Sequence, residues 1–296
     1  MFFIIDCFKL DRSRPEISHA GLNPATALLG IPNLMNQPTY SHSNIDAVDA
    51  ETTTVEMPVQ ATPSQAAPQT KSAVPFYSTP EYLAKQQEIP PALPDFWWMR
   101  PLEIVVASVA LVLGFPVMAT FWILIRLGTP GPVMFRQYRI GRGGKVFAFY
   151  KFRTMYADAR QRFPELYAYS YSPEELDKFQ FKVTEDPRVT PQGRWMRKTS
   201  LDELPNFWNV LTGDMALVGP RPEIPEMLPY YEGEMLEKFR VRPGVTGLAQ
   251  VSGRGHLYFR ETVELDVENV RKRGFLFDTV VFLRTLLSVV ISKGAF

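Results

Sequence analysis

The 296-residue sequence has little of the thiol and imidazole chemistry used in disulfides, metal centres and many nucleophilic sites. Its single cysteine, Cys7, excludes a disulfide framework and a cysteine metal cluster within one chain. Two of its three histidines lie in a proline-rich N-terminal third, which argues against a histidine metal site. The formal net charge is only +1, so we expect no nucleic-acid partner. What is left is the chemistry of carboxylates, arginine and lysine.

Charge and proline divide the chain into two unlike parts. Residues 1–96 contain 5 Lys/Arg and 10 Asp/Glu and hold 12 of the 26 prolines, whereas residues 97–296 contain 27 Lys/Arg and 21 Asp/Glu. A stretch dominated by Thr, Pro, Gln, Ala and Ser has no apolar periodicity to bury, so we predict a disordered tail over residues 1–95. A plain tether is the main interpretation. A short docking segment around residues 76–83, or near the N-terminus, is the alternative.

A long apolar run follows the tail. Residues 104–125 are 22 in number and carry no charged side chain. At about 1.5 Å of rise per residue, a helix of this length crosses a hydrocarbon layer of about 30 Å. Trp97 and Trp98 precede the run and Arg126 follows it, as is typical of a membrane interface. A buried helix of a soluble core is the alternative, but the run has no polar stripe. We therefore predict a membrane helix over residues 96–128.

Pro116 interrupts the apolar run near its middle. Proline lacks the N–H that would complete the helical hydrogen bond, and both a kinked spanning helix and a helix that returns to the same face tolerate this break. Between Arg126 and Ala157 there are seven Lys/Arg and no acidic residue, which predicts that the C-terminal side faces the cytoplasm. These residues leave the spanning and the re-entrant geometry open.

The remaining residues, 129–296, are predicted to form an α+β body that is mostly helical. Two runs rich in β-branched and aromatic residues, 133–140 and 146–152, flank a glycine-rich turn and predict a β-hairpin. A phosphate-binding loop is the alternative for this turn, but the Walker spacing is absent. The last apolar segment is expected to lie against the membrane surface. Helices are predicted over residues 158–182 with a break near 170–173, 201–211, 223–239, 259–271 and 276–292.

The adjacent acids Asp202 and Glu203 lie in the segment that most suggests chemistry. Ser200 precedes them, so a capping box with Ser200 at the N-cap and Glu203 at the third helical position is the purely structural interpretation. A helix N-terminus also attracts phosphate and favours an ionised carboxylate, and the basic side chain of Arg197 lies just upstream. The residues alone leave both interpretations open.

Two further runs hold arginines in stiff loops. Arg221 lies between two prolines, and Arg254 ends a glycine-punctuated run. A rigid loop can present the planar guanidinium to phosphate oxygens in one geometry, although solvated surface turns are the alternative. Lys151 adds another cation. Together with the acid pair, these cations indicate two anionic substrates, such as a nucleotide diphosphate and an anionic lipid. They also indicate Mg²⁺ to screen the charges and a carboxylate as the nucleophile.

Five segments together resemble the bacterial sugar transferases, which are monotopic polyprenyl-phosphate phosphoglycosyl transferases. The resemblance covers roughly residues 97–296. It does not extend over residues 1–95, where larger members carry several spanning helices and a nucleotide-fold domain. The five segments occur in the family's order, which makes the resemblance specific: 151–155 (KFRTM), 186–190 (DPRVT), 200–205 (SLDELP), 217–222 (LVGPRP) and 243–254 (PGVTGLAQVSGR).

The resemblance implies a reaction in which a UDP-sugar gives its phosphosugar to polyprenyl (undecaprenyl) phosphate and UMP is released. In the family this step initiates the synthesis of exopolysaccharide, O-antigen or other glycans. It implies a covalent phosphosugar intermediate on Asp202 and a Mg²⁺ ion held with the help of Glu203. The cations implied to bind substrate phosphates are Lys151, Arg197, Arg221 and Arg254. Structural duties explain Arg153, Arg188 and Gln250 equally well.

The resemblance also implies a location. The family anchor is a re-entrant helix broken at a proline, here Pro116, with both ends in the cytoplasm. The catalytic domain would then lie on the cytoplasmic face of the bacterial inner membrane. Phe115 stands where the family often has serine, so a hydroxyl that could satisfy freed backbone groups is missing. The identity of the sugar is open, as is a homodimer.

Two other classes of protein compete with this interpretation. A catalytically silent membrane scaffold with the same fold would be favoured by an altered acid pair, but Asp202 and Glu203 are both present. A peripheral binder of anionic lipids explains the positive charge of residues 126–155. It gives no purpose to the acid pair or to the arginines in rigid loops.

Overall fold

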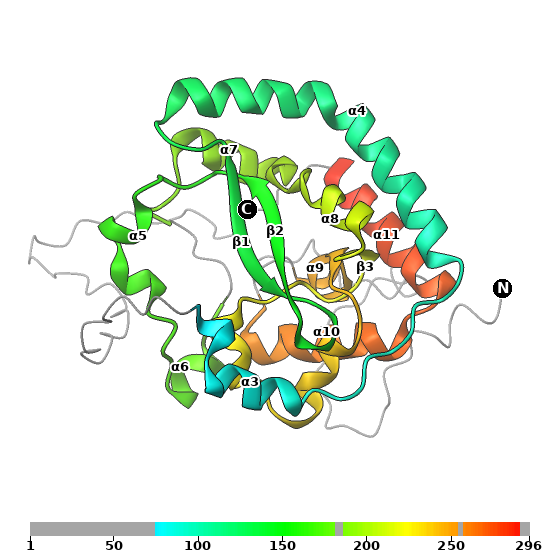
Figure 1. Cartoon of the computed structure of the whole chain (residues 1–296). Helices are drawn as coiled ribbons and strands as arrows, with labels where there is room; N and C mark the ends of the chain where they lie inside the picture. Colours follow the sequence, from blue (N-terminus) through cyan, green and yellow to red (C-terminus); the bar gives the residue numbers. More distant parts are fainter. Residues whose placement is uncertain (1–74, 181–185, 254–256, 291–296) are drawn as a thin grey trace, which may run out of the picture. The chain divides into compact units, whose positions relative to one another are not determined.

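A two-stranded antiparallel hairpin runs through the middle of the body (Figure 1). The computed structural model describes residues 75–180, 186–253 and 257–290. In the hairpin, β1 (Met134–Ile140) pairs with β2 (Val146–Phe152), which confirms the predicted hairpin. Its turn contains a left-handed glycine, Gly143 with φ 67°, a backbone conformation that glycine adopts without a steric penalty.

A second, smaller sheet joins two loop-like runs that the sequence does not mark as strands. β3 (Ala216–Val218) pairs in parallel with β4 (Gly244–Thr246). A Cβ atom added at Gly244 would lie 2.2 Å from the backbone nitrogen of Gly219, so this close approach requires glycine. The small sheet therefore brings the loop that begins at Gly219 beside the glycine-rich run.

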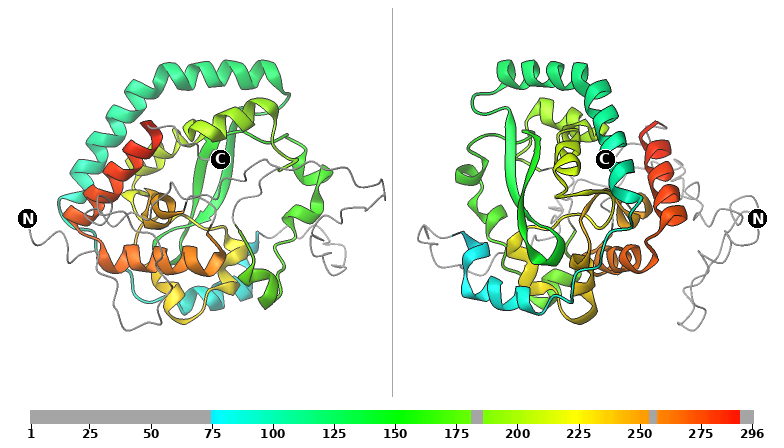
Figure 2. Two further views of the ribbon diagram at one scale, coloured as in Figure 1. Left: turned by 180° about the vertical axis from the view of Figure 1, so that it is seen from behind. Right: turned by 45° about the vertical axis from the view of Figure 1, so that its right-hand side comes forward.

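Helices and short 3₁₀ segments make up most of the rest, so the predicted mostly helical α+β class with a hairpin is confirmed (Figures 1 and 2). The 3₁₀ segments that matter below are η3 (Pro164–Tyr167), η4 (Leu201–Glu203), η5 (Pro225–Tyr230) and η6 (Gly233–Arg240). The described helices are α3 (Pro80–Gln87), α4 (Met99–Gly128), α5 (Ala159–Arg162), α6 (Pro173–Asp177), α7 (Pro191–Thr199), α8 (Asn206–Thr212), α9 (Leu248–Ser252), α10 (Phe259–Lys272) and α11 (Phe275–Val290).

The predicted helices that contain proline are divided in the structure, whereas two that contain none are continuous. The helices predicted over 259–271 and 276–292 correspond to α10 and α11, within the described residues. The helix predicted over 223–239 is instead two 3₁₀ segments, because Pro225 and Pro229 lack the N–H groups that a continuous helix needs. The helix predicted over 158–182 is likewise divided into short pieces.

One helix of the described residues, α4, is long and apolar enough to cross a membrane. It is continuous through Pro116, and Figure 1 shows that it changes direction part-way along. The hydroxyl of Thr120 donates to the carbonyl oxygen of Pro116 at 2.9 Å, a type of contact that accompanies helix bends. A hydroxyl therefore does act on the backbone at this bend, although Phe115 supplies none. The large side chains around the bend, such as Leu113, are exposed.

Both ends of α4 contact the same body. Near the start of the helix, Arg100 donates to backbone carbonyls at the end of α8. The buried carboxylate of Glu103 pairs with the guanidinium of Arg242 at 2.7 Å. Near the end of the helix, Phe121 packs edge-on against Phe152 of β2, with ring centroids 5.8 Å apart. Figure 2 shows α4 extending along one side of the body between these contacts.

The segment just before α4 is folded, which corrects the tail predicted over residues 1–95. Tyr82 of α3 is 1% exposed, and its hydroxyl donates to the carbonyl oxygen of Gly144 in the hairpin turn at 2.8 Å. Burial of a large aromatic side chain with a satisfied hydroxyl offsets the entropy of ordering the segment. The docking alternative around residues 76–83 therefore holds. Residues 1–74 of the predicted tail lie outside the described residues.

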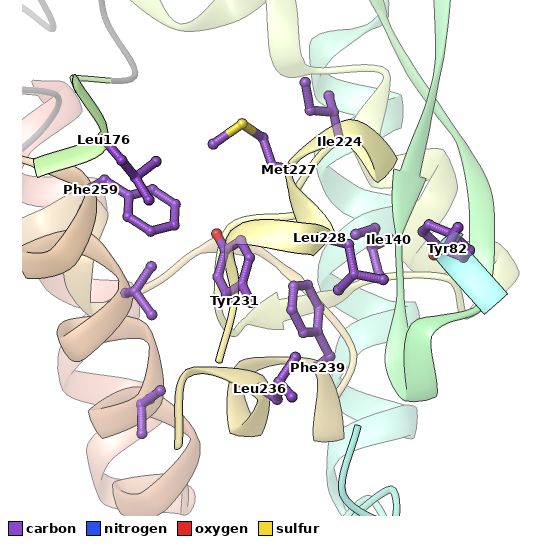
Figure 3. Close-up of a cluster of buried hydrophobic side chains, with 12 residues drawn as sticks. Tyr82, Ile140, Leu176, Ile224, Met227, Leu228, Tyr231, Leu236, Phe239 and Phe259 are labelled. Atoms are coloured by element: carbon purple, nitrogen blue, oxygen red, sulfur yellow. The ribbon is translucent and has the colours of Figure 1, made fainter. Parts of the chain in front are cut away.

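The largest buried hydrophobic cluster of the described residues packs α3, η5, η6 and α10 against the base of the hairpin (Figure 3). At its centre, the ring of Tyr231 lies 5.3 Å from that of Phe259 and 5.0 Å from that of Phe239. The cluster anchors the chain directly after the loop that carries Arg221. Its members are Tyr82, Ile140, Leu176, Ile224, Met227, Leu228, Tyr231, Leu236, Phe239, Phe259, Val263 and Val267.

Candidate active site

The acid pair lies on a 3₁₀ turn and not at the start of an α-helix. Ser200 has φ 56° and ends α7, where its backbone N–H bonds to the carbonyl of Arg197. Its side chain makes no capping hydrogen bond, so the predicted capping box of Ser200 and Glu203 is wrong. The helix predicted over residues 201–211 is η4 followed by α8. The left-handed turn at Ser200 directs Asp202 and Glu203 back toward the hairpin.

Asp202 is the buried carboxylate of the pair, with 6% of its surface exposed. Burial raises the pKa of Asp202 to about 6, and the charge of Glu203 adds to this effect. Lys151 and Arg197 oppose the rise. At neutral pH most of the Asp202 carboxyl groups are therefore ionised while shielded from solvent, a state suited to nucleophilic attack.

Glu203 is paired with the motif arginine from the distant loop. Its Oε1 atom lies 2.7 Å from Nη2 of Arg221. Although burial alone would raise the pKa of Glu203, Arg221 holds it below its usual range. The side chain of Arg221 is 45% exposed, so it has further N–H groups to offer an anionic substrate.

Two further cations face the acid pair from α7 and β2. Nε of Arg197 donates to the hydroxyl of Thr154 at 3.0 Å, and its Nη1 atom lies 3.8 Å from Oδ2 of Asp186. Lys151 is within electrostatic range of Asp202. Burial lowers the pKa of Lys151 to about 8, assisted by nearby arginines, while Asp202 opposes the fall. Lys151 is therefore mostly charged at neutral pH.

The structure thus gathers one group of predicted site residues from four separate segments. Arg254 lies outside the described residues. Arg153 has a structural contact instead, because it donates to the carbonyls of Thr129 and Pro130 just after α4. Gln250 donates to a backbone carbonyl within its own run. The predicted site residues that lie together are Lys151, Arg197, Asp202, Glu203 and Arg221.

Arg139 of β1 is a cation of this site that the sequence analysis misses. Its Nη1 atom donates to the carbonyl oxygen of Pro222 at 3.1 Å, and its charge acts on Glu203 and Arg221. The hairpin register is a signal that could have found it. Lys151 is paired with Phe135, and Arg139 lies four residues further along β1, on the same face of the hairpin.

A buried charge network lies behind the loop that carries Arg221. Nζ of Lys238 lies 3.0 Å from Oδ2 of Asp266 and 3.7 Å from Oε2 of Glu223. The hydroxyl of Tyr231 donates to Glu223 and accepts from Lys238, both at 3.0 Å. Glu223 directly follows the Pro-Arg-Pro sequence, so the network fixes the end of the loop. This makes Lys238 the central cation of two buried carboxylates.

Replacing Lys238 by methionine is expected to lower the free energy of unfolding by about 3–5 kcal/mol, because it leaves the buried Asp266 without its cation and Glu223 with only Arg139, at 3.9 Å. Denaturant unfolding of the full chain in detergent measures the effect. Lys272→Met is the matched control, since Lys272 pairs with Glu268 at the surface and its loss should cost about 1 kcal/mol or less. Equal effects of the two substitutions would contradict the assigned role of Lys238.

Comparison with known families agrees with this geometry. A family model described as bacterial sugar transferase matches residues 95–292, about two thirds of the chain. The chain belongs to the bacterial sugar transferase family. The family predicted from the five motifs is therefore confirmed. The acid pair, the motif arginines and α4 all lie within the matched region of this family member, whereas α3 precedes it.

Three relatives show the range of this family. The chain is 42% identical over 166 residues to the galactosyl transferase CpsE of Streptococcus agalactiae, 34% over 197 residues to the exopolysaccharide production protein ExoY of Rhizobium meliloti, and 38% over 207 residues to the UDP-glucose:undecaprenyl-phosphate glucose-1-phosphate transferase of Escherichia coli. The alignment with CpsE covers 56% of this chain and 36% of that protein. The alignment with ExoY covers 67% of this chain and 87% of that protein. The alignment with the glucose-1-phosphate transferase covers 67% of this chain and 41% of that protein. The chain thus spans most of one relative and less than half of the other two. The names support the predicted class of enzyme, while no comparison supports the homodimer that the sequence leaves open.

Proposed function

We propose that this family member transfers a phosphosugar from a UDP-sugar to undecaprenyl phosphate and releases UMP, as the initiating step of exopolysaccharide or related glycan synthesis. The single observation that carries the proposal is the buried carboxylate of Asp202 among the cations Lys151, Arg197 and Arg221. A relative whose name states a UDP-glucose donor and an undecaprenyl-phosphate acceptor supports this choice of substrates.

In the proposed first step, a carboxylate oxygen of Asp202 attacks the phosphorus that carries the sugar. The bond from this phosphorus to the bridging oxygen of the diphosphate breaks, and UMP leaves with the electron pair. In the second step, a phosphate oxygen of the lipid attacks the same phosphorus. The aspartyl–phosphorus bond breaks, which releases the sugar diphospholipid and restores Asp202. The surrounding cations stabilise the charge that develops on the phosphate oxygens.

Asp202 and Glu203 also fit a Mg²⁺ site that is shared with the donor. Among the described residues, no group of three or more His, Cys, Asp or Glu side chains is placed to hold a metal ion, so the protein would supply one or two carboxylates. Mg²⁺ is often bound in this way, with substrate phosphates and water as its other ligands. Arg221 keeps Glu203 ionised and therefore able to act as such a ligand. When bound, the ion would reduce the repulsion between the carboxylates and the donor phosphates.

A re-entrant α4 is part of the proposal. The contacts of both ends of α4 with the same body support it, because the ends of a spanning helix are separated by a hydrocarbon layer of about 30 Å. A Cβ atom added at Gly114, close to Pro116, would lie 3.5 Å from Cδ1 of Leu204. Because Leu204 directly follows Glu203, this contact favours a position of the acid pair beside the bend of α4, where a lipid phosphate can reach it. The cations after α4 favour the cytoplasmic face of the bacterial inner membrane.

The order of release tests the proposed function. Purified full chain in lipid nanodiscs is incubated with a panel of UDP-sugars and no lipid acceptor, and UMP is measured. With the cognate sugar, we expect up to about one equivalent of UMP per active site, because the covalent step does not need the acceptor. Addition of undecaprenyl phosphate should then give continuous turnover.

Two results would contradict this scheme in different ways. UMP release that strictly requires the acceptor would favour direct transfer in a ternary complex. No UMP release from any UDP-sugar, with acceptor present, would reject the donor class.

A further inference from the structure

A strained tyrosine lies in the segment that follows η3. Tyr169 has φ 49°, and among the described residues the other non-glycine residue with positive φ is Ser200, which positions the acid pair. A bulky side chain in the left-handed region costs free energy, and such residues persist where the surrounding structure enforces them, frequently at functional sites. Tyr169 therefore calls for a structural and a functional explanation.

Two hydrogen bonds to one tyrosine hydroxyl hold the backbone next to Tyr169. The hydroxyl of Tyr230, at the end of η5, donates to the carbonyl oxygen of Tyr169 at 3.1 Å. The same hydroxyl accepts from the backbone N–H of Tyr171 at 2.9 Å. A single phenol thus bridges the two peptide groups on either side of Ser170, the residue that directly follows the left-handed Tyr169. The side chain of Tyr169 packs against the main hydrophobic cluster and is not completely buried.

The ring of Tyr169 is connected to the acid pair through Arg139. Burial raises the pKa of the Tyr169 phenol, and Arg139 and Arg188 act against this rise, so both guanidinium groups are within its electrostatic range. Arg139 in turn acts on Glu203. Arg139 also donates to the carbonyl oxygen of Pro222 at 3.1 Å, next to Arg221, which pairs with Glu203 at 2.7 Å.

A second route leads from Asp202 to the neighbouring Tyr167. Arg197 lies 3.8 Å from Asp186, and Asp186 forms two hydrogen bonds of 2.8 Å with the guanidinium of Arg188. The guanidinium carbon of Arg188 lies 5.0 Å from the centre of the Tyr167 ring. Tyr167 and Tyr169 meet edge-to-face, with ring centroids 6.4 Å apart. Both routes therefore end at one aromatic pair.

We propose that Tyr169, supported by Tyr167, stacks on the nucleobase of the donor and of the released nucleotide. The order of groups carries this inference. A nucleoside diphosphate sugar presents the reacting phosphorus, then a second phosphate, then the ribose and the planar base. The protein presents Asp202, then Arg197, then Arg188 paired with Asp186, then the tyrosine pair. The sugar is attached directly to the reacting phosphorus, so it has no charged group to place against the intervening arginines. The inference rests on the proposed function. It assigns the binding of the nucleobase in the candidate active site to Tyr169 and Tyr167, here called the tyrosine wall.

Binding of UMP to the full chain tests the inference without turnover. Tyr169→Ala is expected to weaken UMP binding by about tenfold or more, because the base loses its stacking partner. Tyr169→Phe keeps the ring and should bind UMP within about twofold of the wild type. Tyr169→Gly removes the ring but accepts the left-handed backbone, so it should show the same loss of UMP binding as alanine without the backbone strain. Pyrophosphate, which has no base, should bind all four proteins equally. In turnover, the alanine variant should raise the KM for the donor more than it lowers kcat.

Several results would overturn the inference. Unchanged UMP binding in the alanine and glycine variants would show that no base stacks on Tyr169. A parallel loss of pyrophosphate binding would show a merely structural role. A changed preference among UDP-sugars with unchanged UMP binding would assign the tyrosine wall to the sugar. In these cases the proposed transfer still stands if wild-type protein releases UMP from a UDP-sugar. A wild-type chain that binds no UMP would reject both proposals.

Discussion

Asp202→Asn is expected to lower the rate of phosphosugar transfer by about 10⁴-fold or more, because an amide has nearly the same shape as the carboxylate but is a very poor nucleophile. UMP release from the cognate UDP-sugar measures the loss, both with and without lipid acceptor. The raised pKa of Asp202 means that its ionised form is unfavourable in the fold. The neutral amide should therefore leave stability at neutral pH unchanged or increased. Flotation with lipid vesicles should show undiminished membrane association.

A matched substitution separates this effect from a general loss of negative charge. Asp158→Asn changes an exposed carboxylate near α5 that pairs with Arg162 at 3.8 Å, and it should leave UMP release within about twofold of wild type. Substantial activity in the Asp202→Asn variant would show that another group attacks the phosphorus. In that case Glu203→Gln is the next variant to examine.

Removal of divalent metal is expected to lower activity by at least about 100-fold, because two adjacent carboxylates and a diphosphate then repel one another without a screening ion. Incubation with EDTA, followed by measurement of UMP release, tests this. Addition of Mg²⁺ in excess of the chelator should restore the full rate. The structure offers carboxylate ligands and no described histidine or cysteine cluster, which favours a hard cation.

Two comparisons make the metal experiment specific. Glu203→Gln should require a higher Mg²⁺ concentration for half-maximal activity, because an amide oxygen is a weaker ligand than a carboxylate. An excess of EDTA already saturated with Mg²⁺ should have no effect, which controls for inhibition by the chelator itself. Full activity after exhaustive chelation would remove the metal from the proposal and Glu203 from its assigned role.

The parts of this molecule that the sequence predicts are those decided by neighbouring residues. The hairpin follows from two runs of β-branched and aromatic residues, and α10 follows from its apolar periodicity and acidic start. The types of residue indicate the acid pair, and the two flanking prolines indicate a rigid loop at Arg221. Family membership added their expected roles.

The parts that the sequence misses are decided by contacts between distant residues. Serine is a residue type that often caps the start of a helix. Ser200 instead adopts a left-handed turn between the end of α7 and η4. Arg139 joins the site only through the pairing of β1 with β2, and the strain at Tyr169 is held by Tyr230, which lies 61 residues further along the chain. Short-range patterns carry no information about such contacts.

The folded arm before α4 has a practical consequence for handling the protein. Tyr82 lies next to Ile140 and Leu228 in the core (Figure 3), yet α3 precedes the part of the chain that the family model matches. A recombinant version that begins at residue 95 would expose these side chains to water. The exposed apolar surface would be prone to aggregation and would lie away from the apolar helix α4. Expression boundaries for crystallisation or cryo-electron microscopy should therefore begin before residue 75.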